Sequence, residues 1–447
     1  MSSIIRVTNV EINNLKNVKR GYFHTNSNFE QLKEADVIGF YGQNGSGKTA
    51  VVDAFSLLHK LIGTITLPEV SSHLIYFNEK SVDLTINFIV KNKFGEYFLK
   101  YKVSLTAGKH RLGIMSESIS YRENIKNKRF KEIICIHKKS KEAGSIITYR
   151  NKSIDVLSEK QRINIGIATS MALENNTSFV FRGELKEVFT NEIEAEIMRN
   201  MTEDFFLDLH VIDNYQYGLV VSNLIMPFSI HHENDRGNIP LEMSEMNLPI
   251  QLFEVIVRVI EQINIVLKNI IPGLEIKVRT IGEPILTKNN EEEIRFEFMS
   301  KKGDVVLPLK SESSGVLKII SILSTLIAVY NKPNACVVID ELDAGIFEYL
   351  LGEILEVMSD NGQGQLFFTS HNLRILEVLP IRNLWFTTLN EEDRYLQLKG
   401  VRKLSNARDI YLRAVQLGGQ DEQIYDETNM YDMKTSFRKA GIQNGEK

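Results

Sequence analysis

This sequence of 447 residues has few of the features that mark secreted, membrane or fibrous proteins. It contains two cysteines, Cys135 and Cys336, and both lie in apolar, strand-like runs, which argues against a disulfide framework and favours a reducing compartment. The first residues lack the apolar stretch of a signal peptide, and the most apolar segment, residues 316–330, carries a lysine and is too short to span a bilayer. We therefore expect a cytoplasmic protein with no membrane contact.

The sequence also lacks a strong charge bias, because 53 Lys and Arg residues stand against 57 Asp and Glu residues, a net charge of −4. This balance argues against extensive coating of nucleic acid, although a local basic face is compatible with it. The remaining composition, 43% hydrophobic and 25% charged, is typical of a globular protein. At this length the chain could form two or three domains, or a single large α/β unit with insertions.

The most informative stretch is the pattern G-x-x-x-x-G-K-[ST], which an apolar strand-like run precedes and a helix-like run follows. This is the context of a phosphate-binding loop. Its glycines allow backbone N–H groups to point at a di- or triphosphate, and the helix N-terminus adds the positive end of its dipole. Lys48 would reach the β- and γ-phosphates, and the Thr49 hydroxyl would hold Mg²⁺. The residues expected to bind the nucleotide here are Gly42, Asn44, Gly45, Ser46, Gly47, Lys48 and Thr49.

A second small-residue turn, Ser313-Ser314-Gly315, precedes an amphipathic helix predicted at residues 316–330. A turn of this kind presents free N–H groups and a helix dipole, so it is a candidate for a second anion site. Taken alone, the same turn is explained equally by a good helix N-cap.

Residues 335–339 read as a buried parallel strand that ends in two carboxylates, Asp340 and Glu341. Sheets of α/β proteins bind ligands at this carboxyl edge. Asp340 would hold Mg²⁺, and Glu341 would orient and deprotonate an attacking water. A further strand, predicted at residues 365–370, would deliver His371 to the same edge.

The order of these motifs resembles that of the ABC ATPase superfamily, over residues 1–120 and 270–390. Residues 12–18, Ile-Asn-Asn-Leu-Lys-Asn-Val, are similar to the opening segment of its RecF, SMC and OLD group. The resemblance implies ATP and Mg²⁺ as cofactors and hydrolysis of ATP to ADP and phosphate. It also implies that residues 342–345 form the D-loop and that His371 is the switch histidine.

In this superfamily the signature turn of one subunit caps the nucleotide of another. The resemblance therefore implies a homo-oligomer, at least a head-to-head dimer, in which Ser313 and Gly315 act in trans. The catalytic residues it implies are Glu341, His371 and Lys48. The residues it adds to nucleotide binding are Ser313, Ser314, Gly315 and Asp343. No glutamine is assigned to the Q-loop.

The fold expected from these features is an α/β, ABC-type P-loop ATPase head. It has a mixed sheet core and an antiparallel β-subdomain, the latter from the alternation over residues 81–121, plus an inserted, mostly helical subdomain. The expected parts are lobe I at residues 1–120, an insert at 121–272, lobe II at 273–390 and a C-terminal strand–helix extension at 391–447.

The subclass follows from what the chain omits. The long separation of phosphate loop and signature turn differs from transporter heads, and the heptad runs of SMC proteins are absent. The chain is similar to the compact RecF/OLD-like group, which includes ATPase subunits of anti-phage and abortive-infection systems. OLD proteins carry a TOPRIM nuclease, and the stretch after His371 is short for one. The first hypothesis is therefore an ATP-driven sensor or scaffold that holds a separate effector, expected to be a nuclease.

The alternative hypothesis is a RecF-like ATPase of DNA repair or recombination, which would bind DNA. A basic run at residues 122–141 is either a solvated edge or a surface for DNA or a partner protein. A transporter head and a purely structural nucleotide-binding protein are less favoured. The basic residues of the run are Arg122, Lys126, Lys128, Arg129, Lys131, Lys138, Lys139 and Lys141.

Overall fold

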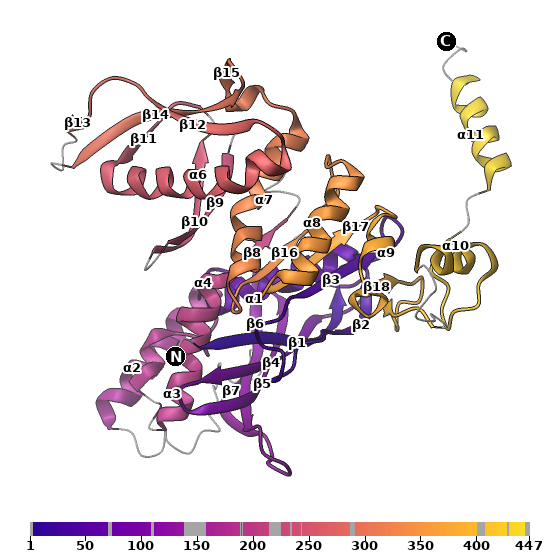
Figure 1. Cartoon of the computed structure of the whole chain (residues 1–447). Helices are drawn as coiled ribbons and strands as arrows, with labels where there is room; N and C mark the ends of the chain where they lie inside the picture. Colours follow the sequence, from indigo (N-terminus) through magenta and orange to yellow (C-terminus); the bar gives the residue numbers. More distant parts are fainter. Residues whose placement is uncertain are drawn as a thin grey trace.

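Two six-stranded sheets, one antiparallel and one mostly parallel, organise the computed structural model of this chain (Figure 1). A smaller sheet lies beside a long helix on the far side of the parallel sheet (Figure 1). The structure describes residues 3–69, 74–108, 111–137, 158–187, 189, 191–213, 225–232, 235–242, 244–286, 291–399, 407–426 and 429–442.

The antiparallel sheet has the strand order β2-β1-β4-β5-β6-β7. Its strands are β1 (Ile4–Leu15), β2 (Val18–His24), β4 (Ser81–Asn92), β5 (Gly95–Ala107), β6 (Leu112–Glu123) and β7 (Lys131–His137). Strand β4 shows why it forms, since alternate residues from Val82 to Phe88 are buried and their neighbours are half-buried. The predicted antiparallel meander over residues 81–121 is confirmed.

The second sheet has the strand order β19-β18-β3-β17-β16-β8, and all neighbours are parallel except β18 and β19. Its strands are β3 (Asp36–Tyr41), β8 (Leu209–Ile212), β16 (Cys336–Ile339), β17 (Gln365–Ser370), β18 (Leu384–Thr387) and β19 (Tyr395–Leu396). The central strands β3, β16 and β17 are buried at every position, as expected for a parallel sheet covered on both faces.

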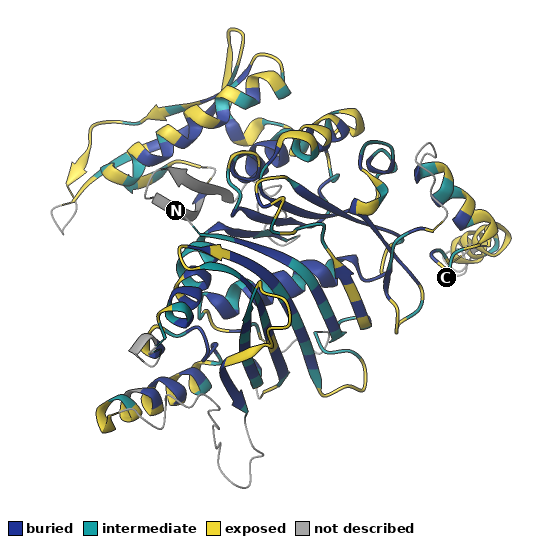
Figure 2. Ribbon diagram, turned by 60° about the horizontal axis from the view of Figure 1, so that its bottom comes forward, coloured by how far each residue is buried: buried dark blue, intermediate teal, exposed yellow. Residues whose placement is uncertain are grey.

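Helix α1 (Lys48–Ile62) lies between the two sheets, and Figure 2 shows this interior as continuously buried. The ring of Phe55 on α1 packs against Phe367 of β17 with 4.8 Å between centroids. The opposite face of the parallel sheet is covered by α7 (Ser314–Asn331), α8 (Glu348–Asn361) and α9 (Ile375–Val378). Helix α7 has the length and composition of a membrane span, but 67% of it is buried in this core.

The smaller sheet joins β11 (Met246–Pro249), β12 (Leu274–Thr280), β13 (Ile285–Leu286), β14 (Glu292–Lys302) and β15 (Val305–Pro308). Helix α6 (Ile250–Ile270) packs on it, and its buried face includes Ile256, Ile260 and Ile263, which are spaced for one side of a helix. A two-stranded sheet is formed by β9 (Ile225–His232) and β10 (Asp235–Glu242). The predicted helix and the two predicted strands that follow it are confirmed.

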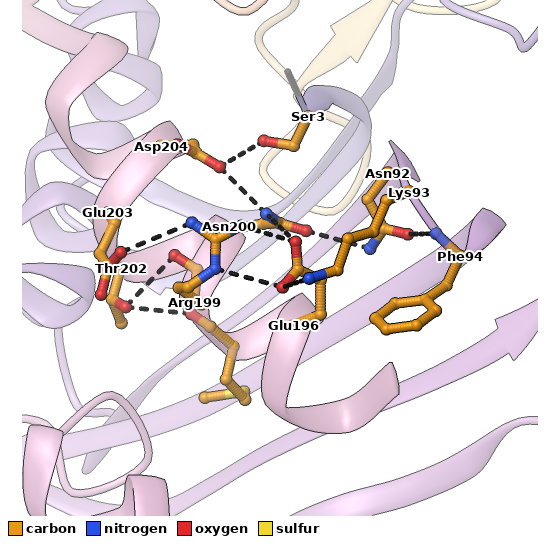
Figure 3. A network of polar contacts seen from close by, with 11 residues as sticks. Ser3, Asn92, Lys93, Phe94, Glu196, Arg199, Asn200, Thr202, Glu203 and Asp204 are labelled. Atoms are coloured by element: carbon orange, nitrogen blue, oxygen red, sulfur yellow. Dashed lines mark hydrogen bonds and ion pairs between the residues drawn. The ribbon is translucent and has the colours of Figure 1, made fainter. Parts of the chain in front are cut away.

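A run of short helices leads from the antiparallel sheet into β8. It consists of α2 (Glu159–Asn175), η3 (Gly183–Glu187), α3 (Glu192–Arg199), the π-helix η4 (Asn200–Phe205) and α4 (Phe206–Asp208). A polar network anchors this run to the edge of β4 (Figure 3). Asn92 Nδ2 donates to Asn200 Oδ1 at 3.0 Å, and Glu196 accepts from Arg199 at 2.6 Å and from Lys93 at 3.2 Å (Figure 3). These bonds hold the chain where it enters the parallel sheet.

The expected α/β class, with a mixed sheet core, an antiparallel subdomain and added helices, is confirmed. The segment expected as an insert, residues 121–272, also holds strands, and its β8 pairs with β16 in the core sheet. The four-part division of the chain remains a prediction. The polar end of the chain includes a helix that the sequence did not predict, α11 (Met430–Ile442), which extends from the body beyond α10 (Ala407–Leu417) (Figure 1).

Candidate nucleotide site

The phosphate-loop motif forms the turn between β3 and α1 at the carboxyl edge of the parallel sheet. Gly47 is the residue before α1 and has a φ of 97°, in the left-handed region that a side chain disfavours. A Cβ at this position would also lie 2.8 Å from the Val18 side chain. No side chain caps α1, so its first backbone N–H groups point into the turn without a capping oxygen. This is the geometry that binds anions at helix N-termini.

The turn is held from behind by the hairpin β18–β19, a support that the sequence did not predict. The Tyr395 hydroxyl donates to the Gly47 carbonyl at 2.8 Å, and the hydroxyls of Ser46 and Thr387 lie 2.5 Å apart. Ser46 also donates to the Gln43 carbonyl at 2.6 Å. From the other side, Asn17 Nδ2 donates to the Gly45 carbonyl. The loop conformation is therefore fixed by side chains far away in sequence.

Lys48, the lysine of the motif, is only 6% exposed, and its Nζ donates to the carbonyls of Gly42 at 2.9 Å and Gln43 at 2.8 Å. Burial lowers the pKa of the Lys48 ammonium to about 8, against the opposing charges of Asp340, Glu341 and Asp343. The lysine is thus positioned between the phosphate loop and the carboxylates of the next strands. Asn44 and Gly45 are exposed, while Ser46 and Gly47 are buried.

Asp340 and Glu341 follow β16, as the sequence predicted, and Thr369 of β17 links them. The Thr369 hydroxyl donates to Asp340 Oδ1 at 2.5 Å and accepts from the Glu341 backbone N–H at 2.8 Å. Glu341 has a φ of 47°, which is uncommon for a residue with a long side chain. A strained backbone of this kind persists only where neighbours over-determine it, and it is often found at functional sites.

Asp340 is 1% exposed, and its second oxygen, Oδ2, is buried without a hydrogen-bond partner among the described residues. A buried carboxylate oxygen of this kind is costly unless a cation or donor meets it. The described residues contain no group of three or more His, Cys, Asp or Glu side chains that could hold a metal ion by themselves. A Mg²⁺ site here would therefore need phosphate and water oxygens in addition to Asp340 and the Thr49 hydroxyl, which suits this ion.

His371 follows β17 at the same edge, and its backbone N–H donates to Asp343 Oδ2 at 3.1 Å. Partial burial lowers the pKa of the His371 imidazole, and the Lys48 cation lowers it further. The Tyr41 hydroxyl donates to the His371 carbonyl at 3.0 Å and fixes the residue against the end of β3. The structure therefore brings Lys48, Asp343 and His371 together at one edge.

The turn Ser313-Ser314-Gly315 begins α7 and lies apart from the phosphate loop, on the far side of residues 340–345. The Ser313 hydroxyl caps the helix by accepting from the Val316 N–H at 3.4 Å. Ser313 and Ser314 are exposed, and Gly315 packs so closely on the Gly345 carbonyl that a Cβ would overlap it. The turn thus faces solvent while it contacts the loop after β16.

Two acidic residues that the sequence analysis did not single out lie beside Asp340. Strand β8 ends at Ile212, whose carbonyl accepts from the Asp340 N–H at 2.9 Å, so the next residue, Asp213, is at the same sheet edge. Asp53 of α1 pairs with Lys16, and burial raises the pKa of its carboxyl, assisted by the charges of Asp340 and Asp213. Parallel pairing of β8 with β16 creates this proximity, which no motif in the sequence signalled.

Comparison with known proteins gives one family. The family model described as "AAA domain, putative AbiEii toxin, Type IV TA system" matches residues 37–377, which is more than half of the chain. The matched region extends from the strand before the phosphate loop to the segment after His371. A search of curated proteins finds no match.

Several solved structures are similar. An SMC head bound to the C-winged helix domain of ScpA has 13% identity and a TM-score of 0.43, over 88% of this chain and 98% of that chain. The SMC head domain from Thermotoga maritima has 12% identity and a TM-score of 0.38, over 88% of this chain and 99% of that chain. The recombination mediator protein RecF, titled RecF-ATPrS in the RecFOR pathway, has 10% identity and a TM-score of 0.36, over 88% of this chain and 98% of that chain.

These likenesses are weak, and the fold assignment rests instead on strand order and pairing. The family match over residues 37–377 shows that this chain belongs to the AAA-domain family of the AbiEii toxin type.

Proposed function

We propose that this protein binds ATP with Mg²⁺ and hydrolyses it to ADP and phosphate. The observation that carries the proposal is the convergence of the phosphate loop, Asp340, Glu341 and His371 on one edge of the parallel sheet. Membership in an AAA-domain family supports nucleotide use. A Mg²⁺ ion, held by the Thr49 hydroxyl and Asp340, would neutralise phosphate charge.

In this proposal the protein's own groups divide the work. The uncapped N–H groups of α1 and the Lys48 ammonium bind and orient the phosphates. Glu341, held in place by its N–H bond to Thr369, accepts the proton of the attacking water. His371, fixed by Asp343 and Tyr41, donates to the terminal phosphate through its imidazole.

We further propose that ATP joins two copies head to head. The exposed turn Ser313-Ser314-Gly315 would cap the nucleotide bound by the other copy, together with Asp343. The support for an action in trans is that this turn lies across residues 340–345 from the phosphate loop of its own chain. Helix N-termini with free donors are suited to a phosphate edge.

At the level of biology we propose a cytoplasmic sensor or scaffold subunit of a phage-defence system. ATP-joined heads would hold a separate effector, a nuclease, and release it after hydrolysis. The support is the AbiEii and toxin–antitoxin description of the family and its agreement with the OLD-like motifs of the sequence.

The second candidate is a RecF-like ATPase of DNA repair. The observation that favours it is the basic edge after β6, where Lys126, Lys128, Arg129 and Lys131 are exposed. Part of this charge is internally paired, since Lys128 lies 3.2 Å from Glu123. Lys138, Lys139 and Lys141 lie outside the described residues. DNA binding through this edge would weaken steeply with added salt.

The experiment that separates the two candidates uses the Glu341→Gln protein, expressed with its neighbouring genes and purified with ATP and Mg²⁺. Mass spectrometry then identifies the copurifying chains. A small nuclease or toxin-like chain in stoichiometric amount supports the defence role. DNA together with recombination proteins contradicts it and favours repair. Loss of ATP from the purified protein would contradict the nucleotide site itself.

A further inference from the structure

Lys318 is the one charged residue on the buried face of α7, and its side chain is 0% exposed. It lies just beyond the first turn of the helix that the Ser313 cap begins, among Leu317, Ile319 and Ile320. A buried ammonium is unfavourable unless nearby negative charge compensates it. Its location therefore calls for an explanation beyond core packing.

The compensating charge comes from the loop after β16. Burial lowers the pKa of Lys318 to about 8, and the negative charges of Asp340, Glu341 and Asp343 oppose this shift. The same three carboxylates, in the same order, act on Lys48 of the phosphate loop. The two lysines therefore share one cluster of carboxylates, one approaching from α1 and the other from α7.

A second contact joins the same turn of α7 to the same loop. Gly315 packs on the Gly345 carbonyl with no room for a Cβ, so the start of the helix cannot shift independently of residues 340–345. The loop itself is held by Thr369 and carries Glu341 at a φ of 47°. A steric contact and a charge contact thus connect the exposed turn to the catalytic carboxylates.

We propose that Lys318 is a positioning residue that couples the capping turn of α7 to the loop of residues 340–345. When Mg²⁺ and phosphate engage Asp340 and Lys48, the charge balance of the shared cluster changes, and Lys318 transmits the change to α7. The turn is then set for a second copy only when the phosphate loop is loaded. This inference rests on the proposed ATP-dependent pairing and names the residue that links its two halves.

The test replaces Lys318 by methionine, which keeps the length of the side chain and removes its charge. ATP binding is measured by calorimetry at protein concentrations that keep the chain monomeric, and pairing by sedimentation with Mg²⁺ and ATP. We expect ATP affinity to change by less than about 3-fold and ATP-dependent pairing to weaken by about 10-fold or more, the range of a typical coupling between sites. Lys310→Met, an exposed lysine before the same helix, should behave as the unmodified protein.

A readout without nucleotide separates this role from simple stability. Hydrogen exchange of the free Lys318→Met protein should become faster in residues 340–345 and at the start of α7, while β3 stays protected. If the variant does not fold, Asp343→Asn removes a facing carboxylate instead and should likewise uncouple pairing from ATP. Pairing that stays fully ATP-dependent in either folded variant overturns the inference. Absence of ATP-dependent pairing in the unmodified protein would instead overturn the proposed function.

Discussion

The N-termini of α1 and α7 are built in opposite ways. Helix α1 begins after Gly47 with no capping side chain, and the preceding loop is buried and held by Tyr395 and Thr387. Helix α7 begins after Ser313, which caps its own helix, and the turn is exposed. The first terminus is therefore organised to bind an anion within its own chain. The second is satisfied locally and needs an external surface before its donors can serve a ligand.

This difference teaches how a single chain can hold two anion sites without their competing. The residues between them, 340–345, contact both, through the carboxylates that face Lys48 and through Gly345 against Gly315. The first three predictions below each break one side of the comparison. The last examines how α1 is anchored at its other end.

The largest effect is expected from Lys48→Ala. This change removes the ammonium that would make two charge-assisted bonds to phosphate, each worth about 1.5–3 kcal/mol, so ATP affinity should fall by about 10³-fold. Calorimetric titration with Mg²⁺ and ATP measures it. Lys60→Ala in the last turn of the same helix is the matched control and should bind normally. Retained affinity in Lys48→Ala would refute the phosphate-loop assignment.

Glu341→Gln should separate binding from chemistry. The substitution keeps the shape of the side chain and removes the proposed base, so turnover should fall by at least about 10²-fold while ATP still binds. Phosphate release under saturating ATP measures turnover, and Glu348→Gln at the exposed start of α8 is the control. Near-normal hydrolysis would exclude Glu341 from the reaction.

Ser313→Arg addresses the exposed terminus alone. A bulky cation on the turn should weaken ATP-dependent pairing by at least about 10-fold through steric and charge conflict, and it should leave ATP binding to the monomer unchanged. Sedimentation with Mg²⁺ and ATP measures pairing. Ser359→Arg, near the far end of α8, serves as the control. An undiminished dimer would mean that the turn lies outside the interface.

The smallest effect concerns the far end of α1. His59 stacks on Phe206 with 4.9 Å between centroids, and burial lowers its pKa from 6.5 to about 4. The unfolded chain therefore binds more protons between these values, so stability is complete above pH 6.5 and declines as pH falls toward 4, by at most about 3 kcal/mol. Urea unfolding across this range should show a smaller decline for His59→Leu, and an equal decline in both proteins would exclude this histidine.

The sequence predicted those parts whose signals are local. The phosphate loop, the strand before Asp340 and the strand before His371 have both a residue pattern and flanking elements, and the structure contains all three elements where expected. The roles of their side chains remain predictions. The fold class followed from the same elements, because a parallel core requires each strand to be buried on both faces.

Other parts depend on contacts that no local pattern encodes. Strand β8 has only four residues and gains its place by pairing with β16. Tyr395 and Thr387 support the phosphate loop from more than 300 residues away, as the separation of 348 residues between Tyr395 and Gly47 shows. Lys318 stood out in sequence only as a charge in an apolar helix, and its partners became evident when the loop after β16 was seen beside it.

The most direct measurement is sedimentation velocity of Glu341→Gln with and without Mg²⁺ and ATP, repeated in the Ser313→Arg background. If the exposed turn of one copy completes the site of another, the single variant forms a dimer only with ATP, and the double variant stays a monomer that still binds ATP. A Glu341→Gln protein that remains monomeric when saturated with ATP would contradict that claim. So would a dimer that forms equally well without nucleotide.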